Sequence, residues 1–321
     1  MTTRISSSQP DKTPEAPYKV LKAVPDLDKV MNDIKRGMLP VVGTNHSADA
    51  DPTSRSEVRG VKVDVAKLAA YTQATGLRLS NELPPTYFFV VAFPLTMDLM
   101  AREDFPFAAT GAVHIANEIT QKRALRVDES YTVRAHGEKL RPHRKGLLID
   151  MVTQVFLDGE TDGEPLWTQV STFLAQGQKF AKGAPVSVTT RGADNGRRLD
   201  SPELPEYAAN GHIKVTGETV SNYVEASGDK NPIHTSNIGA KLFGFPGIIA
   251  HGMYSAAAAL RFLEGKLGGA LRYRVEFYKP VVIPTRVAEW VVPEGDESVN
   301  IQLRSTSKPE KLHLNARVDY L

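Results

Sequence analysis

The sequence of 321 residues predicts an α+β protein built from two tandem copies of one unit. The first observation is an internal repeat, in which helix-like and strand-like stretches recur in the same order in both halves. The second is the pattern inside each half, where a helical segment precedes several stretches of alternating apolar and polar residues. Such alternation is typical of antiparallel strands with one buried face, so each copy should wrap a sheet around a central helix.

The repeat is visible at two sets of landmarks. VKVDVAKLAAYTQATG and IKVTGETVSNYVEASG each predict a short strand followed by a helix that ends at a glycine. Tyr71 and Gly76 match Tyr223 and Gly228 at a constant offset of 152 residues. Further along, GAVHIANEI in the first half matches GALRYRVEF in the second at an offset of 158. The second copy therefore has six extra residues between these landmarks, after its helix-ending glycine.

Alternating stretches rich in Val, Thr, Tyr and Phe predict the strands that come after each helix. In the first copy these are Tyr131–His136, Leu147–Phe156 and Trp167–Ala175, and in the second Arg272–Phe277, Arg286–Val292, Val299–Ser305 and Leu312–Tyr320. The region 183–210 is rich in Gly, Pro, Arg, Asp and Ser and has no sustained periodicity. The predicted organisation is a disordered leader over 1–20, one unit over 21–182, a linker over 183–210 and a second unit over 211–321.

Composition excludes several classes of protein. Hydrophobic residues make up 41% and charged residues 24%, as in ordinary soluble domains, and the net charge of +2 favours neither nucleic acid nor a membrane as partner. The absence of cysteine excludes a disulfide scaffold, a thiol nucleophile and a Cys-based zinc site. The most apolar runs, Tyr87–Met100 and Ile248–Leu263, are too short or too polar to span a membrane, and no signal peptide is visible. We expect a cytoplasmic protein.

A polar cluster comes after the first helix of the second copy. The segment SGDKNPIH contains Asp229, Asn231 and His234 directly after the helix-ending Gly228. Gly228 can end the helix in the left-handed conformation and Pro232 should prevent it from resuming, so we expect a turn that exposes the acidic and imidazole side chains. A carboxylate beside an imidazole can hold a water and move protons near neutral pH, with Asn231 orienting the turn or the water. The alternative is an ordinary solvated turn.

A glycine-bounded apolar segment, GFPGIIAHGMYSAAAALRFL, comes after the polar cluster. Its small residues at Ser255–Ala259 allow close packing around a central helix. Gly252 lies near the predicted helix start, where a free backbone N–H and the positive end of the helix dipole can bind a developing oxyanion. A packing role is the alternative for this glycine. We expect His251 to be a structural residue rather than the base.

These motifs resemble the hydratase signature of the MaoC-like hot-dog family. The matching residues are Tyr223, Ser227, Gly228, Asp229, Asn231, Pro232, Ile233, His234, Ala240, Gly244, Phe245, Ile249, Ala250, His251, Gly252 and Met253. The chain is most similar to actinobacterial double-hot-dog dehydratases, over nearly its whole length after the leader. First-copy matches are weaker and lie at Thr75–Arg78, Phe105–Phe107 and Leu147–Asp150. The resemblance implies a double hot-dog fold, two tandem units that each wrap an antiparallel sheet around a central helix, with a catalytic second unit.

The resemblance also implies an activity. Members of the family remove water reversibly from (3R)-hydroxyacyl thioesters, carried by coenzyme A or an acyl carrier protein, in fatty-acid metabolism. In that scheme Asp229 and His234 share the acid–base work and Gly252 N–H stabilises the thioester enolate, without metal or redox cofactor. The residues expected to line the substrate site are Ser227, Ile249, Ala250, His251 and Met253. The double unit should act as a monomeric pseudo-dimer or as a homodimer.

The first copy should be inactive. The offset of 152 places Leu77, Leu79 and Glu82 at the positions of Asp, Asn and His of the second copy, and the offset of 158 places Pro94 at the glycine. Proline has no N–H to donate to an oxyanion. The apolar helix Tyr87–Phe93 of this copy could line a groove for an acyl chain, or simply pack in the core.

Two other functions belong to different classes. One is an acyl-CoA thioesterase on the same fold, and the other is a non-catalytic protein that binds acyl thioesters. The intact Asp–His–Gly set argues against both. A basic stretch, Lys139–Gly146, could meet coenzyme A phosphates or an acidic carrier protein, but a solvated hairpin turn is favoured because the stretch lies outside the catalytic copy.

Overall fold

A computed structural model describes residues 16–37, 46–192, 196–197 and 199–321. The first half contains β1 Lys19–Leu21, α1 Leu27–Gly37, β2 Arg55–Lys62, α2 Val65–Thr75, α3 Tyr87–Met100, β3 Ala112–Gln121, β4 Ser130–His143, β5 Gly146–Leu157 and β6 Trp167–Gln176. After α4 Val186–Thr189, the second half contains β7 Gly211–Val215, α5 Gly217–Ser227, α6 Pro232–Thr235, α7 Asn237–Leu242, α8 Gly252–Ala258, β8 Leu271–Phe277, β9 Thr285–Glu294, β10 Ser298–Ser305 and β11 Leu312–Tyr320. Each strand predicted from alternation is confirmed.

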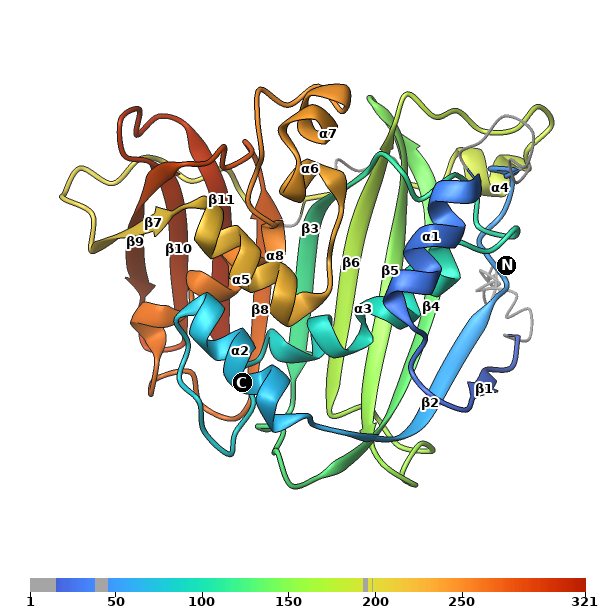
Figure 1. Cartoon of the computed structure of the whole chain (residues 1–321), viewed down its shortest axis with the longest axis horizontal. Helices are drawn as coiled ribbons and strands as arrows, with labels where there is room; N and C mark the ends of the chain where they lie inside the picture. Colours follow the sequence, from blue (N-terminus) through green and yellow to red (C-terminus); the bar gives the residue numbers. More distant parts are fainter. Residues whose placement is uncertain (1–15, 38–45, 193–195, 198) are drawn as a thin grey trace, which may run out of the picture.

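All the strands belong to one sheet, in the order β1-β2-β4-β5-β6-β3-β8-β11-β10-β9-β7. Helices α2, α3, α5 and α8 lie together against one face of this sheet (Figure 1). Apart from β1, the strand order of one half is the mirror of the other, and the halves join where β3 pairs with β8 in antiparallel register. Asn117 pairs with Val275, its own counterpart at the offset of 158, so a pseudo-twofold axis passes between these residues. The predicted double hot-dog is confirmed.

The helix-ending glycines fix the equivalence of the two copies. α2 and α5 have identical lengths of 11 residues, and their boundaries differ by the same offset of 152. Both end at a left-handed residue, Gly76 with φ of 74° and Gly228 with φ of 73°. Any side chain would strain the backbone there, which explains why glycine occupies both positions. Tyr71 and Tyr223 contact each other across the axis, with ring centroids 6.2 Å apart.

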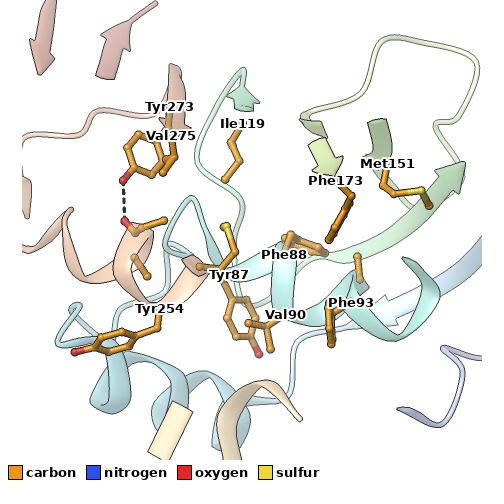
Figure 2. Close-up of a cluster of buried hydrophobic side chains, with 14 of the residues drawn as sticks. Tyr87, Phe88, Val90, Phe93, Ile119, Met151, Phe173, Tyr254, Tyr273 and Val275 are labelled. Atoms are coloured by element: carbon orange, nitrogen blue, oxygen red, sulfur yellow. Dashed lines mark hydrogen bonds between the residues drawn. The ribbon is translucent and has the colours of Figure 1, made fainter. Parts of the chain in front are cut away.

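The core lies between the helices and the sheet. Residues Ala256–Ala259 are fully buried because α8 packs closely, and the Tyr273 hydroxyl on β8 donates to the Ala256 carbonyl (2.7 Å). Figure 2 shows Phe88 of α3 beside Phe173 of the sheet. The small-residue run predicted to allow close packing therefore does so in the second copy, whereas larger side chains fill the same layer in the first.

The linker crosses the sheet face that the helices leave open. Side chains of the second copy hold its backbone: Asn315 donates to the Asp200 carbonyl (3.0 Å), Gln302 to Glu203 (3.1 Å) and Arg304 to Pro202 (2.8 Å). At the other end of the chain, residues 1–15 of the predicted leader lie outside the described residues. β1 overlaps the end of that leader, because Lys19–Leu21 pairs in parallel with β2.

Helix α1 was not predicted, although its sequence carries the signal. Leu27, Val30, Met31 and Ile34 recur at helical spacing and pack against the core, with the other face polar. Within the described part of the chain, no helix has both the length and the apolarity that crossing a bilayer requires.

Candidate active site

The polar cluster of the second copy begins in the turn between the end of α5 and the start of α6. After Gly228 ends α5, the Ser227 hydroxyl donates to the Tyr223 carbonyl (2.7 Å) and accepts from the Asp229 N–H (3.2 Å), which shapes the turn. Asn231 then caps α6 by accepting from the Ile233 N–H (3.3 Å). This oxygen of Asn231 therefore orients the turn, one of the two roles predicted for the side chain.

Pro232 and His234 lie differently from the prediction. α5 does not resume after Gly228, as predicted, but Pro232 starts a separate short helix, α6, at a first position where proline is well tolerated. His234 is consequently buried on that helix, with 9% of its surface exposed, rather than displayed on an open turn. Its Nδ1–H donates to the Ile249 carbonyl (2.8 Å), which leaves Nε2 as the acceptor nitrogen of the neutral ring. Burial lowers the pKa of His234, against the opposing effect of Asp229, so the neutral form prevails near pH 7.

His251 stacks on His234, with ring centroids 3.6 Å apart. Its Nε2–H donates to the Asp229 carbonyl (3.1 Å), and burial, helped by the neighbouring His234, lowers its pKa to about 4. The Nδ1 of His251 and the hydroxyl of Tyr223 are buried and lack hydrogen-bond partners among the described residues. His251 therefore supports the turn and the imidazole of His234, as expected for a structural residue.

The Asp229 carboxylate completes the cluster. Its Oδ1 accepts from the Asn231 N–H (3.1 Å), and the side chain is half-buried. Asp229, His234 and His251 each offer an atom that lies within 4.8 Å of the other two. This separation is within the reach of two hydrogen bonds of about 2.8 Å to a single water, so one water could join two of these groups. Three such residues could also bind a metal ion, although one ring nitrogen of each histidine is already bonded to a carbonyl.

Gly252 is the first residue of α8, as the sequence predicted. At this position the backbone N–H has no partner within the helix, and none accepts from it among the described residues. The ring of Phe277 lies directly against the glycine, because a Cβ at Gly252 would stand 3.1–3.3 Å from three ring carbons. The packing contact is therefore observed, and the role of Gly252 as an oxyanion donor stays a prediction.

Among its described residues, the first copy has no comparable cluster. Leu77 is buried, Leu79 is 51% exposed, and Glu82 is an exposed residue whose backbone forms an isolated antiparallel β-bridge with Arg126. Pro94 lies in the interior of α3, because that helix begins at Tyr87 and not at the position of the glycine. The predicted loss of all four functional groups in the first copy agrees with these positions.

Comparison with known proteins decides the family. The model of the MaoC like domain matches residues 204–313. The 3-hydroxyacyl-thioester dehydratase X of Mycobacterium tuberculosis is 41% identical over 282 residues, which cover 88% of this chain and 94% of that protein. This chain belongs to the MaoC-like dehydratase family. It is therefore a hydro-lyase, and the family predicted from the motifs is confirmed.

Two further similarities show how much of this MaoC-like chain its relatives match. The crystal structure of HtdX from Mycobacterium tuberculosis has a TM-score of 0.70 at 38% identity, covering 83% of this chain and 100% of that one. A fatty acid synthase subunit beta of Schizosaccharomyces pombe is 46% identical over 110 residues, which are 30% of this chain and 5% of that protein. The likeness thus extends over both copies in one relative and over a single segment in the other.

The remaining residues predicted to line the substrate site of the MaoC-like unit lie around the cluster. Ile249 provides the carbonyl that orients His234, and Ala250 donates its N–H to the Val281 carbonyl (2.9 Å). Met253 is buried in the core. These contacts position the loop, and direct contact with substrate stays a prediction for all of them.

An aromatic stack adjoins the site and was not predicted. The ring of Phe277 meets His114 on β3 edge-on, with centroids 5.1 Å apart. His114 in turn stacks between Phe173 (4.8 Å) and Phe89 (6.1 Å), both in the first copy. Its Nε2 is buried and has no partner among the described residues, and burial lowers its pKa to about 4. These rings come from remote strands and a helix, so no local motif could have revealed them.

The N-terminal helix also touches the MaoC-like site. Leu27 packs so close to Gly228 that a Cβ there would lie 2.9 Å from the Leu27 side chain. The next residue, Asp28, forms an exposed ion pair with Lys230 in the turn after α5 (2.7 Å). The first half therefore borders the polar cluster at α1 as well as at β3.

Proposed function

We propose that this chain catalyses the reversible dehydration of (3R)-hydroxyacyl thioesters to trans-2-enoyl thioesters in fatty-acid metabolism. The observation that carries the proposal is the convergence of Asp229 and His234, within reach of a single bridging water, in the copy whose central helix starts at Gly252. The name of the relative in Mycobacterium tuberculosis, 3-hydroxyacyl-thioester dehydratase X, supports the same reaction.

Dehydration breaks a Cα–H bond and the bond between Cβ and the hydroxyl. In the proposed mechanism Asp229 and His234 share the two proton transfers: one, in its unprotonated form, accepts the Cα proton, and the other, in its protonated form, donates to the leaving hydroxyl. The electron pair of the Cα–H bond forms the double bond, and water leaves between the two groups. Because the Nδ1–H of His234 is held by Ile249, the proton moves at Nε2, and the neutral ring is ready to accept it.

The developing enolate needs a donor at the thioester oxygen. The Gly252 N–H has no partner within its helix, and the absence of a side chain lets a ligand approach the backbone. A backbone N–H at this position acts together with the dipoles of the first helical turn. The acyl chain then extends past Phe277 toward the aromatic stack of the first copy, which gives the inactive unit a role in binding.

No metal ion or redox cofactor is needed for this chemistry. A chelator should therefore leave the rate unchanged, despite the metal-like grouping of Asp229, His234 and His251. Sequence composition supports a cytoplasmic location, and the shared sheet supports a monomer that reproduces a two-unit assembly, with a homodimer as the alternative.

One incubation tests the proposal against its alternatives. The protein is mixed with trans-2-butenoyl-CoA while the enoyl-thioester absorbance, the release of free thiol and the configuration of the product are measured. We expect loss of absorbance, no thiol and a (3R)-alcohol. Release of thiol would indicate a thioesterase, an unchanged substrate would indicate a binding protein, and a (3S)-alcohol would contradict the proposed stereochemistry.

A further inference from the structure

Basic residues gather at one end of the sheet. The segments that lead into β2 and β3 reach this end with Asp49, Asp51, Glu103 and Asp104. Four other connections there are basic: the β4–β5 turn, the segment after β6, the β8–β9 connection and the β10–β11 turn. Their lysines and arginines are Arg144, Lys145, Lys179, Lys182, Lys279, Lys308 and Lys311. All but Lys311 are exposed, and no ion pair involves them within the described part of the chain. Glu310 is the only acidic residue of these four connections, each of which is described in full. We call this surface the basic end.

The opposite end of the sheet carries the reverse charge. The β5–β6 connection contains the exposed Asp158, Glu160, Asp162 and Glu164, and the β9–β10 turn contains Asp296 and Glu297. The β3–β4 connection there is mixed. The overall charge of +2 therefore conceals a separation along the strands, which composition alone could not reveal.

The candidate active site lies toward the basic end. Phe277, which contacts Gly252, is the last residue of β8, and the β8–β9 connection begins just beyond it. That connection is bonded to the loop before α8, because Ala250 N–H donates to the Val281 carbonyl (2.9 Å) and Ile249 bridges to Val282. Figure 1 shows α6 and α7 at the same end. The basic stretch of the β4–β5 turn, although it belongs to the first copy, thus reaches the same end as the site.

Helix α7 adds an apolar pair to this end. Ile238 and Leu242 stand one helical turn apart and are 82% and 81% exposed. Exposed aliphatic side chains at this spacing form a small ridge that a second helix can contact. The exposed Lys241 lies beside them. A nucleotide offers nothing that would cover this ridge, whereas a protein partner does.

The width of the basic end also favours a protein over a nucleotide as the partner. Strands β5 and β10, whose turns carry Arg144 and Lys308, are five steps apart in the sheet order. At about 4.8 Å for each step this is roughly 24 Å. A standard protein interface buries about 800 Å² on each partner, a patch of comparable width.

We propose that the basic end, with the α7 ridge at its centre, docks an acidic acyl carrier protein that delivers the thioester to the site between Asp229 and Gly252. The proposal rests on the proposed function, and it selects a carrier protein over coenzyme A as the source of the substrate. Positive potential steers an acidic partner and sets the association rate, and the apolar ridge supplies desolvated contact.

The test uses the full chain and three forms of one substrate. The trans-2-butenoyl group is attached to a small acidic bacterial acyl carrier protein, to coenzyme A and to uncharged N-acetylcysteamine. Binding of the carrier protein is measured separately by calorimetry at low and physiological salt. The variants are Arg144→Glu with Lys145→Glu, Lys308→Glu with Lys311→Glu, and Ile238→Asp with Leu242→Asp. The matched control is Lys62→Glu with Lys67→Glu, which reverses two exposed charges away from the basic end.

We expect each variant pair to weaken carrier binding and kcat/KM for the carrier-linked substrate at least tenfold. The control pair should leave both unchanged, and turnover of the N-acetylcysteamine thioester should stay within twofold throughout. Absence of carrier binding by the unmodified chain would overturn the proposal. A second result would also overturn it: the charge variants lose as much kcat/KM with the coenzyme A thioester as with the carrier-linked one, and the α7 variants lose none. The surface would then bind the phosphates of coenzyme A. Failure to hydrate the uncharged thioester would instead contradict the proposed function, independently of binding.

Discussion

The two copies differ most in the segment that leads into the central helix. In the first copy, α3 extends back to Tyr87, so apolar side chains occupy this segment without a break. In the second, α8 begins at Gly252, and the preceding residues form α6, α7 and a loop. This arrangement brings His234 and His251 together beside Asp229 and leaves a helix start with an unpaired N–H.

Under the proposed mechanism, the two copies separate binding from chemistry. Both copies keep the glycine that ends the first helix, and both contribute five matching strands to one sheet. Under the proposed mechanism, the residues directly after that glycine decide which copy is catalytic, since Leu77 occupies the position that Asp229 has in the second copy. Six extra residues and a few exchanges are enough to convert a packed helix start into a polar site, without a change of fold.

The largest effects should come from the polar pair. Asp229→Asn and His234→Gln keep the side-chain sizes but remove proton transfer, so each should lower hydration of trans-2-butenoyl-CoA by about 10²–10⁴-fold. The glutamine is chosen because His234 is buried, and an alanine there would leave a cavity. Circular dichroism checks folding, and near-normal turnover in either folded variant would refute its assigned role.

Exchange at the helix starts should have the next largest effect. Gly252→Pro removes the proposed donor and should reduce the rate by roughly 10²–10³-fold. Because any Cβ there presses on Phe277, Gly252→Ala is the necessary control, which keeps the N–H. Pro94→Gly restores an N–H in the first copy and should produce no activity. Equal rates for the two Gly252 variants would show that packing, and not the N–H, matters at this residue.

The stacked histidines should make stability depend on pH. The pKa of His251 is lowered from 6.5 to about 4 in the folded protein, so between these values the unfolded chain binds a proton that the folded chain does not. Stability should therefore fall as pH drops from 6.5 toward 4, by on the order of 1–3 kcal/mol for one fully shifted imidazole. Thermal unfolding of the unmodified chain and His251→Gln measures the effect, and identical pH profiles would contradict it.

The smallest predicted effect, on stability, comes from the difference between two buried glutamates, one in each copy. Burial alone would raise the pKa of Glu57 in the first copy, but hydrogen bonds from Arg134 and Arg59 outweigh it and lower the pKa. In the second copy, burial raises the pKa of Glu289 to about 8, and neither carboxylate oxygen has a partner among the described residues.

The contrast predicts a pH-dependent gain from Glu289→Gln. The folded protein retains a proton that the unfolded chain loses above pH 4.5, so stability is lost as pH rises from 4.5 through about 8. The variant should be more stable than the unmodified chain by about 1 kcal/mol at pH 8, and by less at pH 5. Urea unfolding at both pH values measures this difference. A larger gain in stability at pH 5 than at pH 8 would contradict the raised pKa of Glu289. The variant should keep the hydration activity of the unmodified chain.

Local patterns made much of the fold predictable. Alternation fixed the strands because one face of each is buried, and the left-handed glycines marked the same helix end in both copies. α1 was missed, although its apolar spacing was visible, because the residues before it were interpreted as a leader. The family signature identified the polar cluster, and its residues do converge.

Other features depend on contacts that sequence spacing does not encode. The burial of His234 arises from Ile249, 15 residues away, and from the stacking of His251. The stack around His114 joins rings from β3, β6, β8 and α3, which only the sheet order brings together. The separation of charge between the two ends likewise depends on strand direction, since the net charge is small.

The turnover of the double variant Asp229→Asn, His234→Gln tests most directly whether the chain has one active site, in the second copy. It is measured with trans-2-butenoyl-CoA beside the unmodified chain, after circular dichroism has shown that the variant is folded. We predict a rate reduced by at least about 10²-fold, close to that of the more severe single variant, because the two groups act as a unit. A folded double variant that retained about half of the activity would contradict the account, because the first copy would then be catalytic as well.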